Sequence, residues 1–150
     1  MDREILFKAK RKDNGEWVEG FLLSDGMREP EHWFVGSIVI EPCKGTACDE
    51  WDIRGIALEE IDISSLCHFT GLTDKNGQKI WENDILRRDG YWDIRIEFEN
   101  GAFMVRNADK IQYINRVTYT FISTFDIKEY EVIGNIFDGG FNDGKKTKEN

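Results

Sequence analysis

Apolar and polar residues alternate most strictly over residues 91–106, where the even-numbered positions up to Phe98 are apolar and the odd-numbered ones are mostly charged. This pattern predicts a strand with one buried face, on which Trp92 points inward. Asn100-Gly101 follows, a dipeptide typical of a type I′ hairpin turn. A two-residue loop places Phe98 opposite Phe103, so the apolar face continues across the turn. We therefore predict a hairpin here.

A second Asn-Gly pair lies in the stretch TGLTDKNGQKIWENDIL, residues 70–86. Its flanks are rich in residues that favour strands, so it also predicts a hairpin. A two-residue loop at Asn76-Gly77 places Asp74 opposite Lys79, and Leu72 opposite Trp81 across the ladder.

The third Asn-Gly pair belongs to the turn Lys12-Asp13-Asn14-Gly15 within residues 5–23. A two-residue loop there brings Asp13 opposite Glu16, and these carboxylates repel. A four-residue loop brings Arg11 opposite Glu16, and these charges attract. We favour the longer loop.

The rest of the chain is predicted from shorter patterns. Loops are expected where Gly, Pro and polar residues gather, and strands where apolar residues do. The predicted segments are loops over 24–32, 42–50 and 107–115, strands over 33–41, 116–123 and 130–137, short extended pieces over 51–65, and one helical turn over 123–129 capped by Ser123 or Thr124.

Composition restricts the function. Of the 150 residues, 33% are charged, and the net charge of −9 repels phosphate backbones on average. The dense cationic run is Lys8, Lys10, Arg11 and Lys12. The chain has no secretory leader and no apolar run long enough to span a bilayer. Its 3 cysteines are odd in number, which favours reduced thiols in the cytoplasm.

Three blocks of the chain resemble the YopX family of phage and prophage proteins. They are residues 3–20, residues 69–85 and residues 131–138. The chain departs from the family pattern at Asn83, where the family usually has Gly, although Asn also tolerates left-handed backbone. It departs again at Gly139-Gly140, where the family often has Asn-Pro, so a looser end to the last strand is expected. Residues 24–60 have no counterpart in the family.

The resemblance implies a mostly-β fold built from antiparallel hairpins, with little helix and an SH3-like small barrel over about residues 69–138. It also implies phage or prophage origin, and it supplies no residue-level activity. Together with the chain length, it predicts a single domain over residues 1–141. Within that domain, residues 24–60 form an irregular excursion. Residues 142–150, polar and rich in Lys, are predicted to be a disordered tail.

Metal and thiol chemistry are both disfavoured. The candidate zinc ligands are Cys43, Cys48, His32, Cys67 and His68. The spacing of Cys43 and Cys48 lies at the loose end of the zinc range, and no second pair with matching spacing follows. Cys67 and His68 are adjacent, so on a strand they point to opposite faces and cannot pair as nucleophile and base. Cys67 with His32 has no support from the sequence. We predict no metal and no cofactor.

Paired carboxylates occur at Glu82 and Asp84, and at Glu97 and Glu99. Each pair shares a strand face, as a glycosidase-like acid and base would. Strict alternation favours a solvated face for Glu97 and Glu99 instead. At a bend, Asp84 is favoured to accept backbone N–H groups. The chain also has no glycine-rich phosphate loop and no Gly-x-Ser-x-Gly elbow, so we predict no enzyme.

A protein-interaction surface is predicted at Trp81, Glu82 and Tyr91, because aromatic residues are enriched at interfaces. Core packing is the favoured alternative for Trp81. We expect a non-enzymatic accessory module that binds protein or assembles with itself. The alternatives are an acidic mimic of nucleic acid that inhibits a host protein, and a nucleic-acid-binding barrel that uses the cationic run. A hydrolase ranks last.

Overall fold

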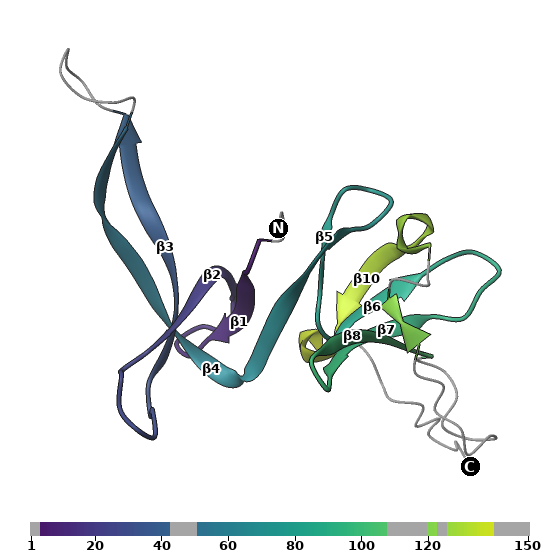
Figure 1. Cartoon of the computed structure of the whole chain (residues 1–150), viewed down its shortest axis with the longest axis horizontal. Helices are drawn as coiled ribbons and strands as arrows, with labels where there is room; N and C mark the ends of the chain where they lie inside the picture. The colour runs from purple at the N-terminus through teal and green to yellow at the C-terminus, as the bar shows by residue number, and fades with distance from the viewer. Residues whose placement is uncertain (1–3, 43–50, 108–119, 123–125, 140–150) are drawn as a thin grey trace. The chain divides into compact units, whose positions relative to one another are not determined.

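The structure is a computed structural model, and it describes residues 4–42, 51–107, 120–122 and 126–139 (Figure 1). The chain is mostly β with antiparallel sheets, which confirms the predicted fold class. The strands are β1 (Phe7–Arg11), β2 (Trp17–Ser24), β3 (Trp33–Pro42), β4 (Trp51–Thr73), β5 (Lys79–Trp81), β6 (Asp84–Arg87), β7 (Ile94–Glu99), β8 (Ala102–Asn107), β9 (Thr120–Phe121) and β10 (Glu131–Asn135). Short 3-10 turns, η2 (Ile127–Glu129) and η3 (Ile136–Asp138), flank β10.

The chain divides into two compact units. One unit spans Ile5–Cys67, and the other includes the described residues from His68 onward. The first sheet has the order β1-β2-β3-β4-β5 with an additional β1–β4 pairing, and the second has the order β10-β6-β7-β8-β9. Strand β4 runs through the boundary between the units. The single-domain organisation over residues 1–141 stays a prediction.

The β1–β2 hairpin has the predicted four-residue loop. The backbone N–H of Arg11 donates to the carbonyl of Glu16 over 2.8 Å, and Lys8 lies opposite Glu19. The preference for charge-matched register, drawn from the sequence, is therefore confirmed.

The core of the first unit is small. Its buried members are Ala9, Val35 and Ile61, with partly buried Val18, Leu22, Trp33 and Leu66 packed around them. Strands β2 and β3 approach closely here, because a Cβ on Gly20 would lie 2.0 Å from the carbonyl oxygen of Gly36. Only glycine fits at this position.

Residues 24–60 are more regular than the predicted excursion. The loop after β2 is organised by Asp25, whose carboxylate accepts N–H groups of Met27, Glu31 and His32. Strands β3 and β4 then pair continuously from Phe34↔Glu60 to Pro42↔Trp51, with one irregularity after Val39. The predicted strand over 33–41 is confirmed, whereas the separate extended pieces over 51–65 form part of one long strand. The predicted loop at 42–50 lies almost wholly outside the described residues.

The β7–β8 hairpin has the predicted register and turn. Phe98 lies opposite Phe103, and the φ angles of Asn100 and Gly101 are 51° and 82°. The prediction for Trp92 is wrong, since β7 begins only at Ile94 and Trp92 is 54% exposed. The alternation of apolar and charged residues in the sequence begins before strand β7, which starts only at Ile94.

The β4–β5 hairpin exists, but its predicted register is wrong. Thr73 lies opposite Lys79, and Phe69 lies opposite Trp81. Asp74 pairs with Gln78 through the backbone, which leaves a three-residue loop. The carboxylate of Asp74 selects this loop by accepting the N–H groups of Asn76 and Gln78, over 2.8 and 2.9 Å.

A larger core fills the second unit. Its buried members are Ile80, Leu86, Ile94, Ile96, Phe103, Val105, Ile127 and Tyr130. They come from β5, β6, β7, β8, η2 and the residue that precedes β10. This core holds the second unit together without any helix longer than one turn in the described residues.

The C-terminal elements differ in detail from the prediction. The helical turn is η2, preceded by Asp126, which makes no side-chain cap hydrogen bond. The predicted caps Ser123 and Thr124 lie outside the described residues, as do residues 108–119 and the tail 142–150. The final strand ends at Asn135, earlier than predicted. Its end is not loose, because Asn135 and Asp138 form a reciprocal capping box.

Candidate functional site

The three residues of the predicted interaction surface occupy different environments. Trp81 is 3% exposed and its ring lies 5.2 Å from that of Phe69, so it packs in the interior, as the favoured alternative held. Tyr91 is 60% exposed, and the guanidinium of Arg88 lies 4.3 Å from its ring centre. The structure therefore does not present Trp81 and Tyr91 as an exposed aromatic pair.

Glu82 has a partner that the sequence did not indicate. Its Oε2 atom lies 2.6 Å from Nδ1 of His68 and accepts the backbone N–H of His68 over 3.2 Å. The imidazole also stacks on Phe98, with ring centres 4.9 Å apart. His68 lies in β4 and Glu82 directly follows β5, so the pairing of these two strands brings the side chains together. No local pattern in the sequence predicts this contact.

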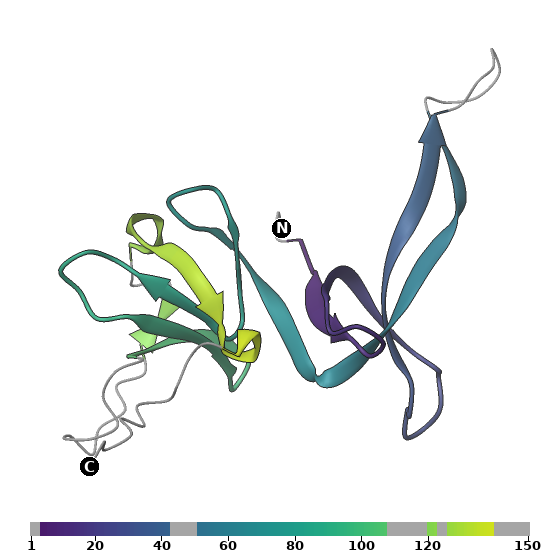
Figure 2. The ribbon, with the colours of Figure 1, turned by 180° about the vertical axis from the view of Figure 1, so that it is seen from behind.

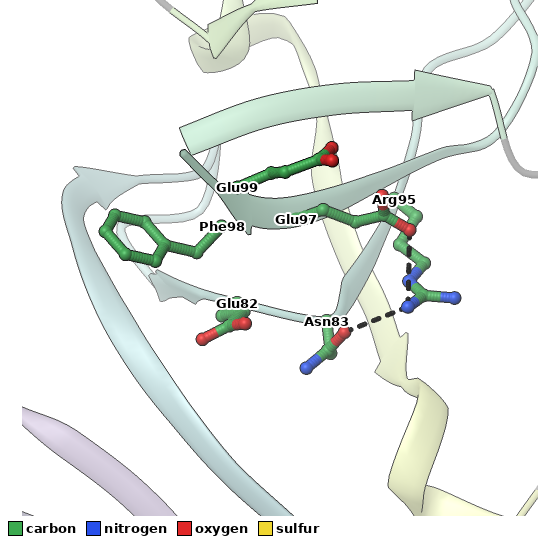
Figure 3. A pocket seen from close by; sticks show the side chains of 6 residues that line it. All are labelled: Glu82, Asn83, Arg95, Glu97, Phe98 and Glu99. Atoms are coloured by element: carbon green, nitrogen blue, oxygen red, sulfur yellow. Dashed lines mark hydrogen bonds and ion pairs between the residues drawn. The ribbon is translucent and has the colours of Figure 1, made fainter. Parts of the chain in front are cut away.

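A shallow pocket of about 310 Å³ lies beside this pair (Figure 3). It is lined by Glu82, Asn83, Arg95, Glu97, Phe98 and Glu99. The guanidinium of Arg95 donates to Oδ1 of Asn83 over 3.2 Å and lies 3.3 Å from the carboxylate of Glu97. Its buried Nε has no hydrogen-bond partner. The pocket is an open polar surface in which most charges are already compensated by protein groups.

The carboxylate pairs do not form an acid and base. The prediction of a solvated face is wrong for Glu97. Its side chain is only 14% exposed, and its carboxylate also lies 3.3 Å from the guanidinium of Arg106. Glu99 is exposed, in agreement with the prediction. Asp84 is buried and accepts the backbone N–H of Trp81 and the amide of Asn135, both over 2.8 Å. The predicted structural role of Asp84 is confirmed.

Sequence reasoning missed the role of Asn135. Its side-chain amide donates to the carbonyl of Glu82 over 3.1 Å as well as to Asp84, and its Oδ1 accepts the N–H of Phe137. These bonds join the bend at Asn83 to the end of β10. Asn83 itself has φ 66°, so the left-handed backbone predicted at this departure from the family pattern is confirmed.

Of the residues weighed for metal or thiol chemistry, those that the structure describes form no cluster of potential metal ligands. Cys67 is buried, with Sγ 3.4 Å from the carbonyl of Ser65. His32 lies 2.8 Å from Glu60 instead. Cys43 and Cys48 lie outside the described residues. Among the described side chains, no group of three or more potential ligands could hold a metal ion.

The cationic run is engaged by neighbouring groups. The Nζ atoms of Lys8 and Lys10 lie 4.7 and 4.4 Å from the ring centre of Trp17. Arg11 pairs with Asp13 and Glu59, and Lys12 pairs with Glu60. These contacts hold the pKa of the Glu60 carboxyl below its usual range, through hydrogen bonds from Lys12 and then His32.

Strands β3 and β4 pair as a long ribbon (Figures 1 and 2). One face of this ribbon carries exposed apolar side chains that the sequence analysis did not identify. It consists of Ile38, Ile40, Ile56 and Leu58, which are between 48% and 59% exposed. We call these four residues the apolar stripe. Ile38 lies directly opposite Ile56, and Leu58 lies opposite Gly36, so these side chains share one face. The signal in the sequence was the absence of charge from residues 36–40 and 55–58.

Exposed apolar patches of this kind mark interaction surfaces in soluble proteins. The stripe is the strongest candidate functional surface in the part of the chain that the structure describes. It takes the place of the predicted surface at Trp81, of which only Tyr91 is fully accessible.

Comparison with known proteins gives one family. A protein-family model described as "YopX protein" matches residues 6–140. This range includes residues 24–60, so the expectation that they have no counterpart in the family is wrong. The crystal structure of protein EF1440 from Enterococcus faecalis is similar, with a TM-score of 0.49 and 20% identity, over 91% of this chain and 95% of that one. No curated protein matches this chain. In the described residues, no helix has the length and apolar character needed to cross a membrane.

Proposed function

Because this chain belongs to the YopX family, we propose that it is a phage- or prophage-encoded accessory module that acts by binding protein and not by catalysis. The observation that carries the proposal is the apolar stripe. Four half-exposed aliphatic side chains sit on a two-stranded ribbon, and such a ribbon is marginally stable in water unless something packs on it.

The absence of protective charges supports the same conclusion. Exposed strands in monomeric proteins usually carry charged side chains, especially Lys, that discourage association with other chains, and the one irregularity after Val39 does not supply such a charge here. Residues 36–40 and 55–58 contain no Lys, Arg, Asp, Glu or Pro, although 33% of the whole chain is charged. An uncharged surface of this kind is suited to packing against another protein surface.

The proposal includes a cytoplasmic location, which fits a Cys67 that is buried and not in a disulfide, and an SH3-like arrangement of the second unit, which fits its continuous antiparallel sheet. No observation specifically supports either alternative, the acidic mimic of nucleic acid or the nucleic-acid-binding barrel. A nucleic-acid-binding surface would need accessible cations, and the cationic run faces Trp17 and carboxylates.

Affinity purification from host cells tests the proposal. The bait is the full chain, compared with Ile38→Lys and with Ser37→Lys, a control on the opposite, exposed face of β3. We expect a defined set of proteins, further copies of this chain included, that Ile38→Lys loses and Ser37→Lys retains. Identical recovery with all three baits would contradict the proposal.

Fluorescence anisotropy with single- and double-stranded DNA distinguishes the alternatives. We expect no saturable binding at about 0.15 M salt, where electrostatic contacts are already screened. Saturable binding that weakens steeply with added salt would replace protein binding with nucleic-acid binding as the function.

A further inference from the structure

We propose that the apolar stripe of one chain packs against the apolar stripe of a second copy, about a two-fold axis. The inference rests on the proposed protein-binding function and names the partner. It follows from the geometry of the stripe, from its lack of charge, and from the area that it offers.

The four side chains of the stripe lie on one face of the paired β3 and β4. Ile38 and Ile56 are directly opposed across the ladder, and Ile40 continues the row along β3. Leu58 covers Gly36, since a Cβ at that glycine would lie 2.8 Å from Cδ2 of Leu58. On the other face Ser37 lies opposite Ala57 and Val39 lies opposite Gly55, so Val39 is the exposed apolar side chain there, and the four larger ones gather on the stripe.

Charge favours a second copy over a different protein. In a two-fold interface the same patch meets itself, so the patch should carry no net charge of one sign. The chain as a whole does not meet that condition, because its net charge is −9. The stripe can, because residues 36–40 and 55–58 carry no charge. A basic partner, attracted by the overall charge, would find no carboxylate on the stripe to pair with.

The exposed area of the stripe agrees with the area expected for the apolar centre of a dimer interface. Four half-exposed aliphatic side chains form a patch on the order of 400 Å², at the size of functional patches on monomers. This is about half of the roughly 800 Å² that each partner buries in a standard interface. The remainder is the polar rim that normally surrounds an apolar centre.

Packing two ribbons face to face also removes a weakness of each. A single two-stranded ribbon has no second layer to cover its apolar face, whereas two ribbons form a four-stranded, two-layered unit. The second copy thereby supplies the cover that the described part of this chain does not provide for the stripe.

Sedimentation equilibrium of the full chain tests the proposal. We expect a concentration-dependent dimer with a dissociation constant in the micromolar range, about 10 µM. In Ile38→Lys two ammonium groups enter the apolar centre, and we expect the dissociation constant to rise at least about 100-fold. Ser37→Lys, the matched control on the opposite face, should change it by less than about 3-fold.

Hydrogen exchange provides a second readout that does not depend on how well a variant folds. In the wild-type chain, backbone amides of residues 36–40 and 55–58 should exchange more slowly as protein concentration rises, while those around Ile96 should not change. A dimer whose exchange is unaffected at the stripe would overturn the proposal.

The outcomes separate this inference from the proposed function. A wild-type monomer at about 100 µM, well above the expected constant, overturns stripe-to-stripe packing. If Ile38→Lys then still loses host proteins, the protein-binding function stands with a different partner. If Ile38→Lys loses nothing, both proposals fail. A dimer that Ile38→Lys leaves intact also overturns the stripe as its interface.

Discussion

At the scale of single residues, buried polar side chains connect distant parts of the second unit. Asp74 joins its own loop to β10, because Oδ2 accepts the N–H of Val132 over 3.0 Å. Asp84 and Asn135 join the bend at Asn83 to the end of the same strand. Hydrogen bonds to charged groups contribute about 1.5–3 kcal/mol each, so these few side chains matter to the free energy of unfolding.

Asp74→Asn should destabilise the chain by about 1.5–3 kcal/mol, because it replaces the acceptor of the Val132 N–H with a donor. The effect should depend on pH. Burial raises the pKa of Asp74, but the N–H groups of Val132, Gln78 and Asn76 outweigh burial and hold this pKa below its usual value. A lowered pKa stabilises the fold fully above the unfolded pKa of about 4, and this contribution is lost as pH falls through the folded pKa.

Urea unfolding at several pH values measures this difference. The gap between wild type and Asp74→Asn should be constant above about pH 5 and shrink toward lower pH. Asp126→Asn is the control, since Asp126 is exposed and its side chain makes no cap hydrogen bond to η2. A gap that stays constant down to pH 2, or one that Asp126→Asn reproduces, would count against the role of Asp74.

At the scale of elements, three Asn-Gly pairs form three different hairpin loops. The loop has four residues at Asn14-Gly15, three at Asn76-Gly77 and two at Asn100-Gly101. In the first, Arg11 lies opposite Glu16, and the side chain of Asn14 accepts the N–H of Glu16 and donates to its carboxylate. An aspartate carboxylate decides the second. Only the third follows the intrinsic preference of the dipeptide for a type I′ turn.

Gly101→Ala tests how much the third turn relies on its backbone. Gly101 has φ 82° and open space where a Cβ would be placed, so the cost comes from the left-handed conformation alone. We expect a loss of about 1–2 kcal/mol in the free energy of unfolding. Gly101→Asn is larger but tolerates this backbone, and should lose clearly less than alanine. Equal losses in thermal or urea unfolding would point to side-chain crowding instead.

At the scale of the whole molecule, the two units have cores of very different size. Among the described residues, the hydrophobic core of the first unit has three buried members, Ala9, Val35 and Ile61, with partly buried side chains packed around them. The hydrophobic core of the second unit has eight buried members, from several strands and η2. Because buried apolar area is the main source of stability, the second unit is expected to resist opening more strongly.

Native-state hydrogen exchange should show this difference between units. Amides at Ile80, Leu86 and Ile96 should be protected to a higher opening free energy than amides at Ala9 and Ile61. Measurement at low protein concentration keeps any association through the stripe from adding protection to the first unit. Uniform protection across both sets would mean that the chain opens as one cooperative body.

The sequence was informative where local chemistry and long patterns agree. Alternation and a type I′ turn together specified the β7–β8 register, and charge matching specified the β1–β2 register. The left-handed backbone at Asn83 and the structural role of Asp84 also followed from local preferences. In each case the deciding atoms lie within a few residues of one another along the chain.

Only the tertiary structure decided the rest. The burial of Trp81, the contact of Glu82 with His68, and the role of Asn135 all depend on strands that are distant in sequence. The continuity of β4 and the exposure of the stripe depend equally on which strands pair and which faces stay open. A side chain's alternation along a strand identifies its face, but whether that face is covered is determined by the rest of the fold.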